Sequence, residues 1–141
     1  MKRTSLVLTA ILALACSALQ AQSLNARANV PFDFWMGKTL MPAGDYQVNY
    51  SNGLLQVRDE PGGESLETSL TIPEHKLNPP KQTVLVFNRY GDSYFLAKLS
   101  APELDGGCIL PKTPREKERF SGVRGDKPVL IALHRKYKLA K

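Results

Sequence analysis

The feature that most constrains this chain is an alternation of apolar and polar side chains with period two, which glycine or proline interrupts at short intervals. Successive side chains of a β-strand point to opposite faces of a sheet, so this alternation is typical of strands that bury one face. Segment 45–50 (DYQVNY) shows it clearly. The intervals are too short to hold a helix between consecutive strands, as a parallel sheet requires. We therefore expect an antiparallel β domain.

The alternation and the turn residues together predict about seven strands. Asn52-Gly53 favours a tight hairpin of type I′, and Gly91-Asp92 favours a second hairpin further along the chain. The apolar run at 83–90 (TVLVFNRY) predicts a central strand. This pattern favours a mainly β fold, either an antiparallel β-sandwich or a small, partly open barrel. The predicted strands are 30–35, 45–51, 54–58, 65–72, 83–90, 93–100 and 128–137.

The first of these strands carries an aromatic residue on its outward face. Phe32 and Phe34 share the face that is expected to pack on the core. Asp33 and Trp35 then point the other way, and this pair is a candidate for contact with a ligand. Pro31 has no N–H to donate, which predicts an edge position for the strand.

Residues 113–120 (TPREKERF) predict one short helix of about two turns near the C-terminal end. Thr113 is a favourable N-cap, and Pro114 suits the first helical position. Glu116 follows the cap by three residues, where its side chain can complete a capping box. These three residues together predict the start of the helix at Pro114.

Residues 1–21 have the composition of a cleavable signal peptide. Lys2 and Arg3 provide positive charge, an apolar run follows at 6–15, and small residues precede Ala21. The apolar run is too short to cross a bilayer as a helix. We therefore expect cleavage after Ala21 and export to the periplasm or out of the cell.

Removal of the signal peptide would leave residues 22–141, a length that suits a single β domain. No apolar run within it approaches the roughly 20 residues of a membrane span. Cys16 offers an alternative, lipoprotein anchoring, in which the lipid would be attached to this residue. Cys108 would be the only cysteine left after cleavage, so no internal disulfide is expected. We expect it to be a small buried hydrophobe, with an intermolecular cross-link as the alternative.

Three stretches resemble, in the same order, a family of small exported proteins of unknown function from soil bacteria. They are VPFDFWMGKTLMPAGDYQV at 30–48, VLVFNRYGDSYFLAKL at 84–99 and LPKTPREKER at 110–119. The pattern that carries the resemblance is V-P-F-x-F, L-P-A-G-x-Y, R-Y-G-D-x-Y-F and L-P-K. Met41 stands where the family usually has Leu, and Asn88 where it often has His. The resemblance implies export and a shared β fold, and it carries no activity over to this chain.

Positive charge is concentrated in a basic C-terminal segment. Residues 112–141 hold ten Lys or Arg against three acidic residues, whereas 22–111 hold seven against ten. Arg115 and Arg119 are four residues apart and share one face of the predicted helix. With the tail, they are candidates for contact with an anionic surface, a solvated helix and tail being the alternative. The candidates in the tail are Arg135, Lys136, Lys138 and Lys141.

The expected partners follow from this charge and from export. An anionic envelope polymer or a lipid surface would attract the basic segment. Nucleic acid is not expected, because export removes the protein from most of it. A protein partner is a further possibility, since an exposed strand edge can pair with another chain.

The sequence contains no motif of established catalytic or metal chemistry. His75, His134 and Cys108 do not have the C-x-x-C or H-x-x-x-H spacing of metal sites. No G-x-S-x-G or S-x-x-K motif of a serine nucleophile occurs. We therefore expect no cofactor, and a non-catalytic binding or structural protein of the cell envelope or extracellular space. The alternatives are a surface accessory protein that pairs through its β edges and a small hydrolase whose site assembles only in space.

Overall fold

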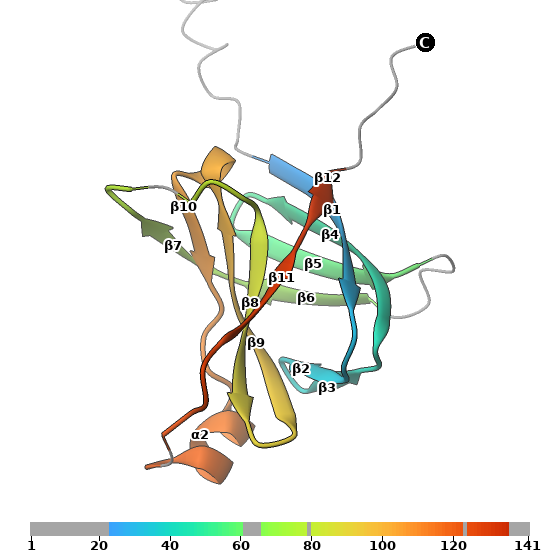
Figure 1. Ribbon diagram of the computed structural model, residues 1–141, viewed down its shortest axis with the longest axis vertical. Helices are drawn as coiled ribbons and strands as arrows, with labels where there is room; N and C mark the ends of the chain where they lie inside the picture. The colour runs from blue at the N-terminus through green and yellow to red at the C-terminus, as the bar shows by residue number, and fades with distance from the viewer. Residues whose placement is uncertain (1–22, 61–65, 79, 123, 136–141) are drawn as a thin grey trace, which may run out of the picture.

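Two β-sheets pack against each other around one apolar core in the computed structural model, which describes residues 23–60, 66–78, 80–122 and 124–135 (Figure 1). The predicted signal peptide at 1–21 and Cys16 lie outside these residues. The fold is mainly β without a closed barrel, which is consistent with a β-sandwich. The predicted fold class is therefore confirmed, and the barrel alternative is not.

The first sheet has five antiparallel strands. Their order across the sheet is β12-β1-β4-β5-β6. Neighbours β4 and β5 form the hairpin predicted around Asn52-Gly53, whose φ angles of 52° and 77° are those that a type I′ turn requires. The strands are β1 (Ser23–Val30), β4 (Gly44–Ser51), β5 (Leu54–Asp59), β6 (Leu66–Leu70) and β12 (His134–Arg135).

The second sheet has the order β11-β8-β9-β10-β7, and a small hairpin of β2 and β3 attaches to β9. The predicted hairpin around Gly91-Asp92 is confirmed as β8 and β9. The bounds are β2 (Phe34–Met36), β3 (Thr39–Met41), β7 (Ile72–His75), β8 (Val84–Tyr90), β9 (Ser93–Ala101), β10 (Gly106–Ile109) and β11 (Val129–Ala132). A 3-10 helix, η1 (Pro102–Leu104), and one α-helix, α2 (Pro114–Phe120), complete the described elements.

The start of the chain differs from the prediction. Residues 30–35 are not one strand, because β1 ends at Val30 and β2 begins only at Phe34. Pro31 lies in the break, and β1 has a neighbour on each side, so the predicted edge position is wrong. Strand β1 was not predicted, although its side chains alternate regularly between exposed and buried. Its buried face includes Ala26 and Ala28, which are too small to give a strong hydrophobic signal.

Two predicted strands change sheets partway along. The predicted strand 65–72 corresponds to β6 of the first sheet, and only its last residue, Ile72, belongs to β7 of the second. The segment 128–137 divides at Leu133 into β11 of the second sheet and β12 of the first. The sequence does not mark either change of sheet, because residues 72–75 (IPEH) and 129–132 (VLIA) do not alternate regularly between apolar and polar side chains.

The core is formed by the inward faces of both sheets. Phe34, Phe87 and Tyr46 are its largest aromatic members, and Phe34 contacts the other two rings edge to face at 5.2 and 5.4 Å. Cys108 in β10 is completely buried, as predicted, and burial raises the pKa of its thiol. A thiol with no exposed surface cannot reach another chain without local unfolding.

Tyr46 differs from the other core aromatics because it carries a hydroxyl group. This group donates a hydrogen bond to the carbonyl of Pro42. Burial, and to a smaller extent the charges of Asp59 and Asp33, raises the pKa of Tyr46 from 10.0 to about 12. The protonated phenol is therefore the form that the fold stabilises.

Alkaline pH is expected to destabilise the wild type more than a Tyr46→Phe variant. Between pH 10 and about 12 the unfolded phenol ionises while the folded one keeps its proton, so rising pH favours the unfolded chain. The extra loss of unfolding free energy should reach roughly 1 to 3 kcal/mol, and it should vanish below pH 10. Urea denaturation of both proteins across this range measures it, and parallel profiles would contradict the prediction.

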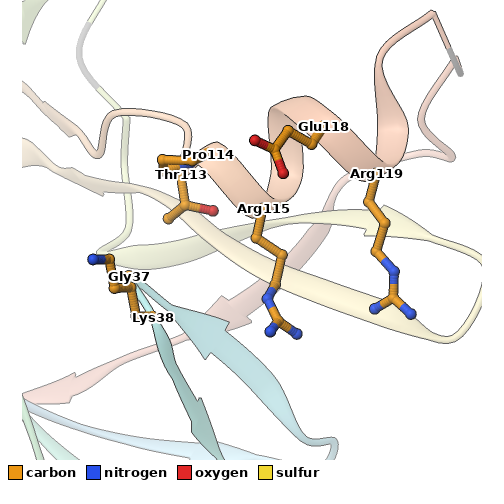
Figure 2. A pocket seen from close by; sticks show the side chains of 7 residues that line it. All are labelled: Gly37, Lys38, Thr113, Pro114, Arg115, Glu118 and Arg119. Carbon is orange, nitrogen blue, oxygen red and sulfur yellow. The ribbon is translucent and has the colours of Figure 1, made fainter.

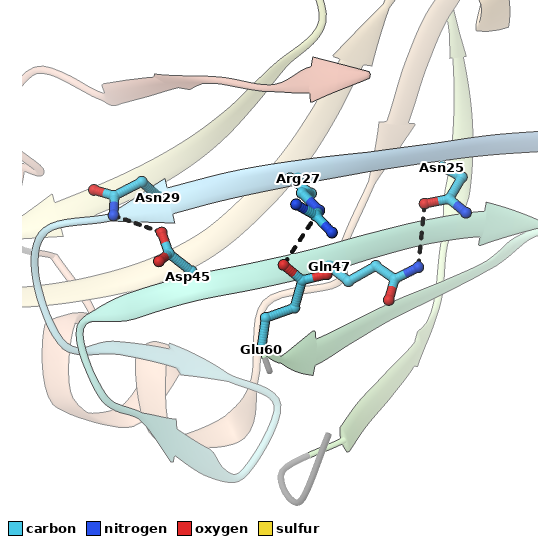
Figure 3. Close-up of polar contacts among 6 residues, drawn as sticks. All are labelled: Asn25, Arg27, Asn29, Asp45, Gln47 and Glu60. Atoms are coloured by element: carbon cyan, nitrogen blue, oxygen red, sulfur yellow. Dashed lines mark hydrogen bonds and ion pairs between the residues drawn. The ribbon is translucent and has the colours of Figure 1, made fainter. Parts of the chain in front are cut away.

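The solvent face of the first sheet is polar, and side-chain contacts cross it between neighbouring segments (Figure 3). Because these groups are exposed or partly exposed, each contact contributes on the order of 1 kcal/mol or less. The contacts are Asn29 Nδ2 to Asp45 Oδ1 at 2.7 Å, Gln47 Nε2 to Asn25 Oδ1 at 3.3 Å, and Arg27 Nε to Glu60 Oε2 at 3.2 Å.

Candidate functional site

Trp35 and Arg115, predicted separately as contact residues, meet in the structure. The Arg115 Cζ atom lies 4.1 Å from the centroid of the Trp35 ring. A guanidinium over an indole face gains a cation–π interaction and keeps its N–H groups free at its edge. The pair therefore holds a cation in a defined position without neutralising it.

The position of Trp35 follows from the alternation within β2. Phe34 and Met36 are fully buried, which turns Trp35 to the opposite face, where it remains half-buried. The tip of the β2–β3 hairpin is held by Thr39, whose hydroxyl donates to Glu67 Oε2 at 2.8 Å. The ring is thus placed by the core behind it and by β6 beside it.

Helix α2 brings Arg115 to this ring. The Thr113 hydroxyl accepts a hydrogen bond from the Glu116 backbone N–H at 3.2 Å, which confirms the predicted N-cap. At the other end, Phe120 stacks on Tyr90 with centroids 4.4 Å apart and meets Phe95 at 5.6 Å. The helix is therefore capped at its start and packed at its end against β8 and β9.

Glu116 is used differently from the prediction. Instead of returning to the N-cap, its carboxylate is buried beneath the helix, and Oε1 accepts from Tyr90 Oη at 2.9 Å and Asn88 Nδ2 at 3.1 Å. Burial and the neighbouring Glu116 carboxylate raise the pKa of Tyr90, so the phenol keeps the proton that it donates.

A crevice of 370 Å³ lies between α2 and the β2–β3 turn, and we call it the basic crevice (Figure 2). Arg115 and Arg119 extend from the helix in the same direction. Within the described residues, neither arginine nor Lys38 forms an ion pair with a carboxylate. The crevice therefore presents three cations against one carboxylate. Its lining residues are Gly37, Lys38, Thr113, Pro114, Arg115, Glu118 and Arg119.

A second cavity of 260 Å³ adjoins the basic crevice, and we call it the apolar hollow. The two share Gly37, Thr113 and Pro114, so they lie side by side. Glu116 also lines the hollow, where it places a carboxylate among apolar side chains. The walls are formed largely by Trp35, Leu70, Phe95, Leu96, Leu110 and Pro111.

The other predicted contact residues do not join this site. Asp33 lines neither cavity, and its Oδ1 accepts a hydrogen bond from the Ala43 N–H at 2.8 Å, which stabilises a turn. Arg135 lies in β12, at the opposite end of the molecule from α2 in Figure 1. The fold therefore does not bring the backbone position of Arg135 together with Arg115 and Arg119. Lys136, Lys138 and Lys141 lie outside the described residues.

Lys38 and Glu116 are the site residues that sequence reasoning missed or misassigned. Lys38 follows Trp35 by three residues across a tight turn. This short spacing was the feature of the sequence that could have indicated that Lys38 lies near Trp35. For Glu116, the capping box offered a role within its own helix, so no contact with β8 was predicted. Nothing in the sequence indicated that the helix would pack over Asn88 and Tyr90.

A third cavity, of 420 Å³, is lined by residues including Lys81, Thr83, Glu103 and His134. Its lining includes no Phe, Tyr or Trp, and His134 is exposed. Among the described residues, no three His, Cys, Asp or Glu side chains gather as a metal site would require.

No described helix has the length and apolar character needed to cross a membrane.

Searches against protein-family models, curated proteins and solved structures found no match to this chain.

Proposed function

We propose that this protein is an exported, non-catalytic binding protein whose basic crevice takes up an anionic ligand of the cell envelope. The observation that carries the proposal is the position of Arg115, which is held over Trp35 and lines one cavity together with Lys38 and Arg119. Export rests on the composition of residues 1–21.

The crevice favours an anion because three of its lining side chains are cations that lack carboxylate partners among the described residues. Guanidinium groups present paired N–H donors that match a carboxylate or a phosphate group. Arg115 is positioned before the ligand arrives, so less side-chain entropy is lost on binding. These features support a binding role and require no reacting group.

Removing both crevice arginines is expected to weaken binding of a polyanion strongly. In an Arg115→Gln/Arg119→Gln variant, the dissociation constant for oligogalacturonate should rise roughly 10- to 100-fold, because charge-assisted hydrogen bonds are lost. Wild-type binding should also weaken as salt rises from about 50 to about 200 mM. Titration calorimetry measures both effects.

The matched control is Lys117→Gln/Arg124→Gln, which removes the same charge from exposed positions that do not line the crevice. It should bind almost as the wild type does. Equal losses in the two double variants would mean that net charge alone attracts the anion, and the proposed crevice function would then be abandoned.

A further inference from the structure

The two cavities beside α2 form one binding surface with two different chemistries. They share Gly37, Thr113 and Pro114, and Arg115 of the basic crevice lies on Trp35 of the apolar hollow. One molecule that occupies both would meet cations at one end and an apolar wall with a carboxylate at the other. The hollow, at 260 Å³, is near the lower end of the size range of small-molecule sites, about 300 to 1,000 Å³.

The carboxylate in the apolar hollow restricts what can fill it. Glu116 is only 5% exposed, and both of its hydrogen bonds reach Oε1. Among the described residues, no cation forms an ion pair with it. Oε2 therefore remains as an acceptor for a ligand donor, and a ligand without a donor would desolvate this oxygen without replacing its hydrogen bonds.

A ligand that fills both cavities needs an anionic group, an apolar surface and a hydrogen-bond donor, and three classes of ligand can be compared on these requirements. An acyl chain would fill the apolar walls but would offer Glu116 no hydrogen-bond donor. A polyphosphate offers neither an apolar face nor a donor, and its charge would oppose that of the carboxylate. A sugar ring offers C–H faces to Trp35 and hydroxyl donors to Glu116, and an acidic group on it or on the next ring can reach Arg115.

We propose that the ligand is an acidic saccharide, with one sugar ring in the apolar hollow against Trp35 and Glu116 and an acidic group in the basic crevice. This inference rests on the proposed function of the crevice. It adds the class of ligand, and it assigns Glu116 as the residue that distinguishes a saccharide from other polyanions.

The test compares three probes of different chemistry on the wild type and on Glu116→Gln. The probes are oligogalacturonate, inorganic polyphosphate of similar total charge, and phosphatidylglycerol vesicles. The Gln side chain can still accept from Asn88 and Tyr90 through Oε1, so the variant should fold, and its thermal unfolding verifies this. Trp35 is the only tryptophan of the chain, so its fluorescence reports directly on occupation of the hollow.

Glu116→Gln is expected to weaken oligogalacturonate about tenfold, because an acceptor for its hydroxyl groups is lost, and to leave polyphosphate binding unchanged or slightly tighter, because the repulsion by the carboxylate is removed. Glu118→Gln is the matched control, since it removes the same charge from an exposed side chain of the crevice. It should affect the two soluble anions alike. Oligogalacturonate should also change the Trp35 emission, whereas polyphosphate should not.

Other outcomes overturn the inference in distinguishable ways. If polyphosphate or the vesicles bind at least as tightly as oligogalacturonate, or if Glu116→Gln weakens no probe, the saccharide assignment fails while the crevice function stands. If Glu116→Gln weakens oligogalacturonate and polyphosphate equally, its role is not specific for hydroxyl groups, and the assignment fails again. If no probe binds, both the saccharide assignment and the proposed function fail.

Discussion

Replacement of Gly107 by Ala is expected to cost the domain about 3 kcal/mol or more of unfolding free energy. Gly107 has a φ of +139°, a conformation that only glycine adopts without strain. It also pairs with Ser100 in the β9–β10 ladder, where an added Cβ would overlap the carbonyl oxygen of Leu99 and lie 2.9 Å from the Ser100 Cα. Both obstacles are backbone atoms of a central strand, so neither can move aside cheaply.

Gly44→Ala provides the control for this substitution. Gly44 also lies in a strand, but its φ is not positive, and an added Cβ would meet no atom within 4 Å. The control should change the stability by less than about 1 kcal/mol. Urea denaturation of both variants measures the difference, and similar midpoints would show that β10 adapts to a side chain after all.

The second large effect is expected for Phe87→Ala, with a loss of roughly 3 to 5 kcal/mol. The Phe87 side chain is completely buried, and its ring meets Phe32 at 5.1 Å and Phe34 at 5.2 Å. Its removal leaves a cavity between the sheets and withdraws support from β2, the strand that carries Trp35. The emission of Trp35 should therefore change even below the unfolding transition.

Leu130→Ala is the comparison for Phe87→Ala. Leu130 lies on the neighbouring strand β11 and is 62% exposed, so truncation should cost less than about 1 kcal/mol. Thermal and urea unfolding of the two variants provide the measurement. A Phe87→Ala protein as stable as Leu130→Ala would mean that the sheets close over the lost ring, and the estimate from cavity formation would be wrong.

The local features that the sequence predicted correctly depend on neighbouring residues alone. The hairpin turn at Asn52-Gly53 follows from positive φ angles that these two residues tolerate. The N-cap at Thr113 follows from a hydroxyl that reaches the first turn of its own helix. Such features need no knowledge of the rest of the chain, and the structure confirms them.

Sheet membership is different, because it depends on partners that are distant in sequence. The change of sheet at Thr71 depends on strands that are distant in sequence, and nothing near this residue indicates it. The same holds for β1, whose small alanines are buried because their face of the sheet packs on the core. Burial of a weakly hydrophobic side chain is decided by the packing around it.

The candidate site likewise combines features that depend on neighbouring residues with contacts between elements that are distant in sequence. By itself, the sequence determined that Arg115 and Arg119 share a helix face and that the chain carries one tryptophan beside a buried phenylalanine. Only the tertiary structure decided that the helix covers Asn88 and Tyr90, that Glu116 is buried there, and that Arg115 rests on Trp35. The physical reason is that a helical or strand period specifies which way a side chain points, whereas its partner is set by how the elements pack.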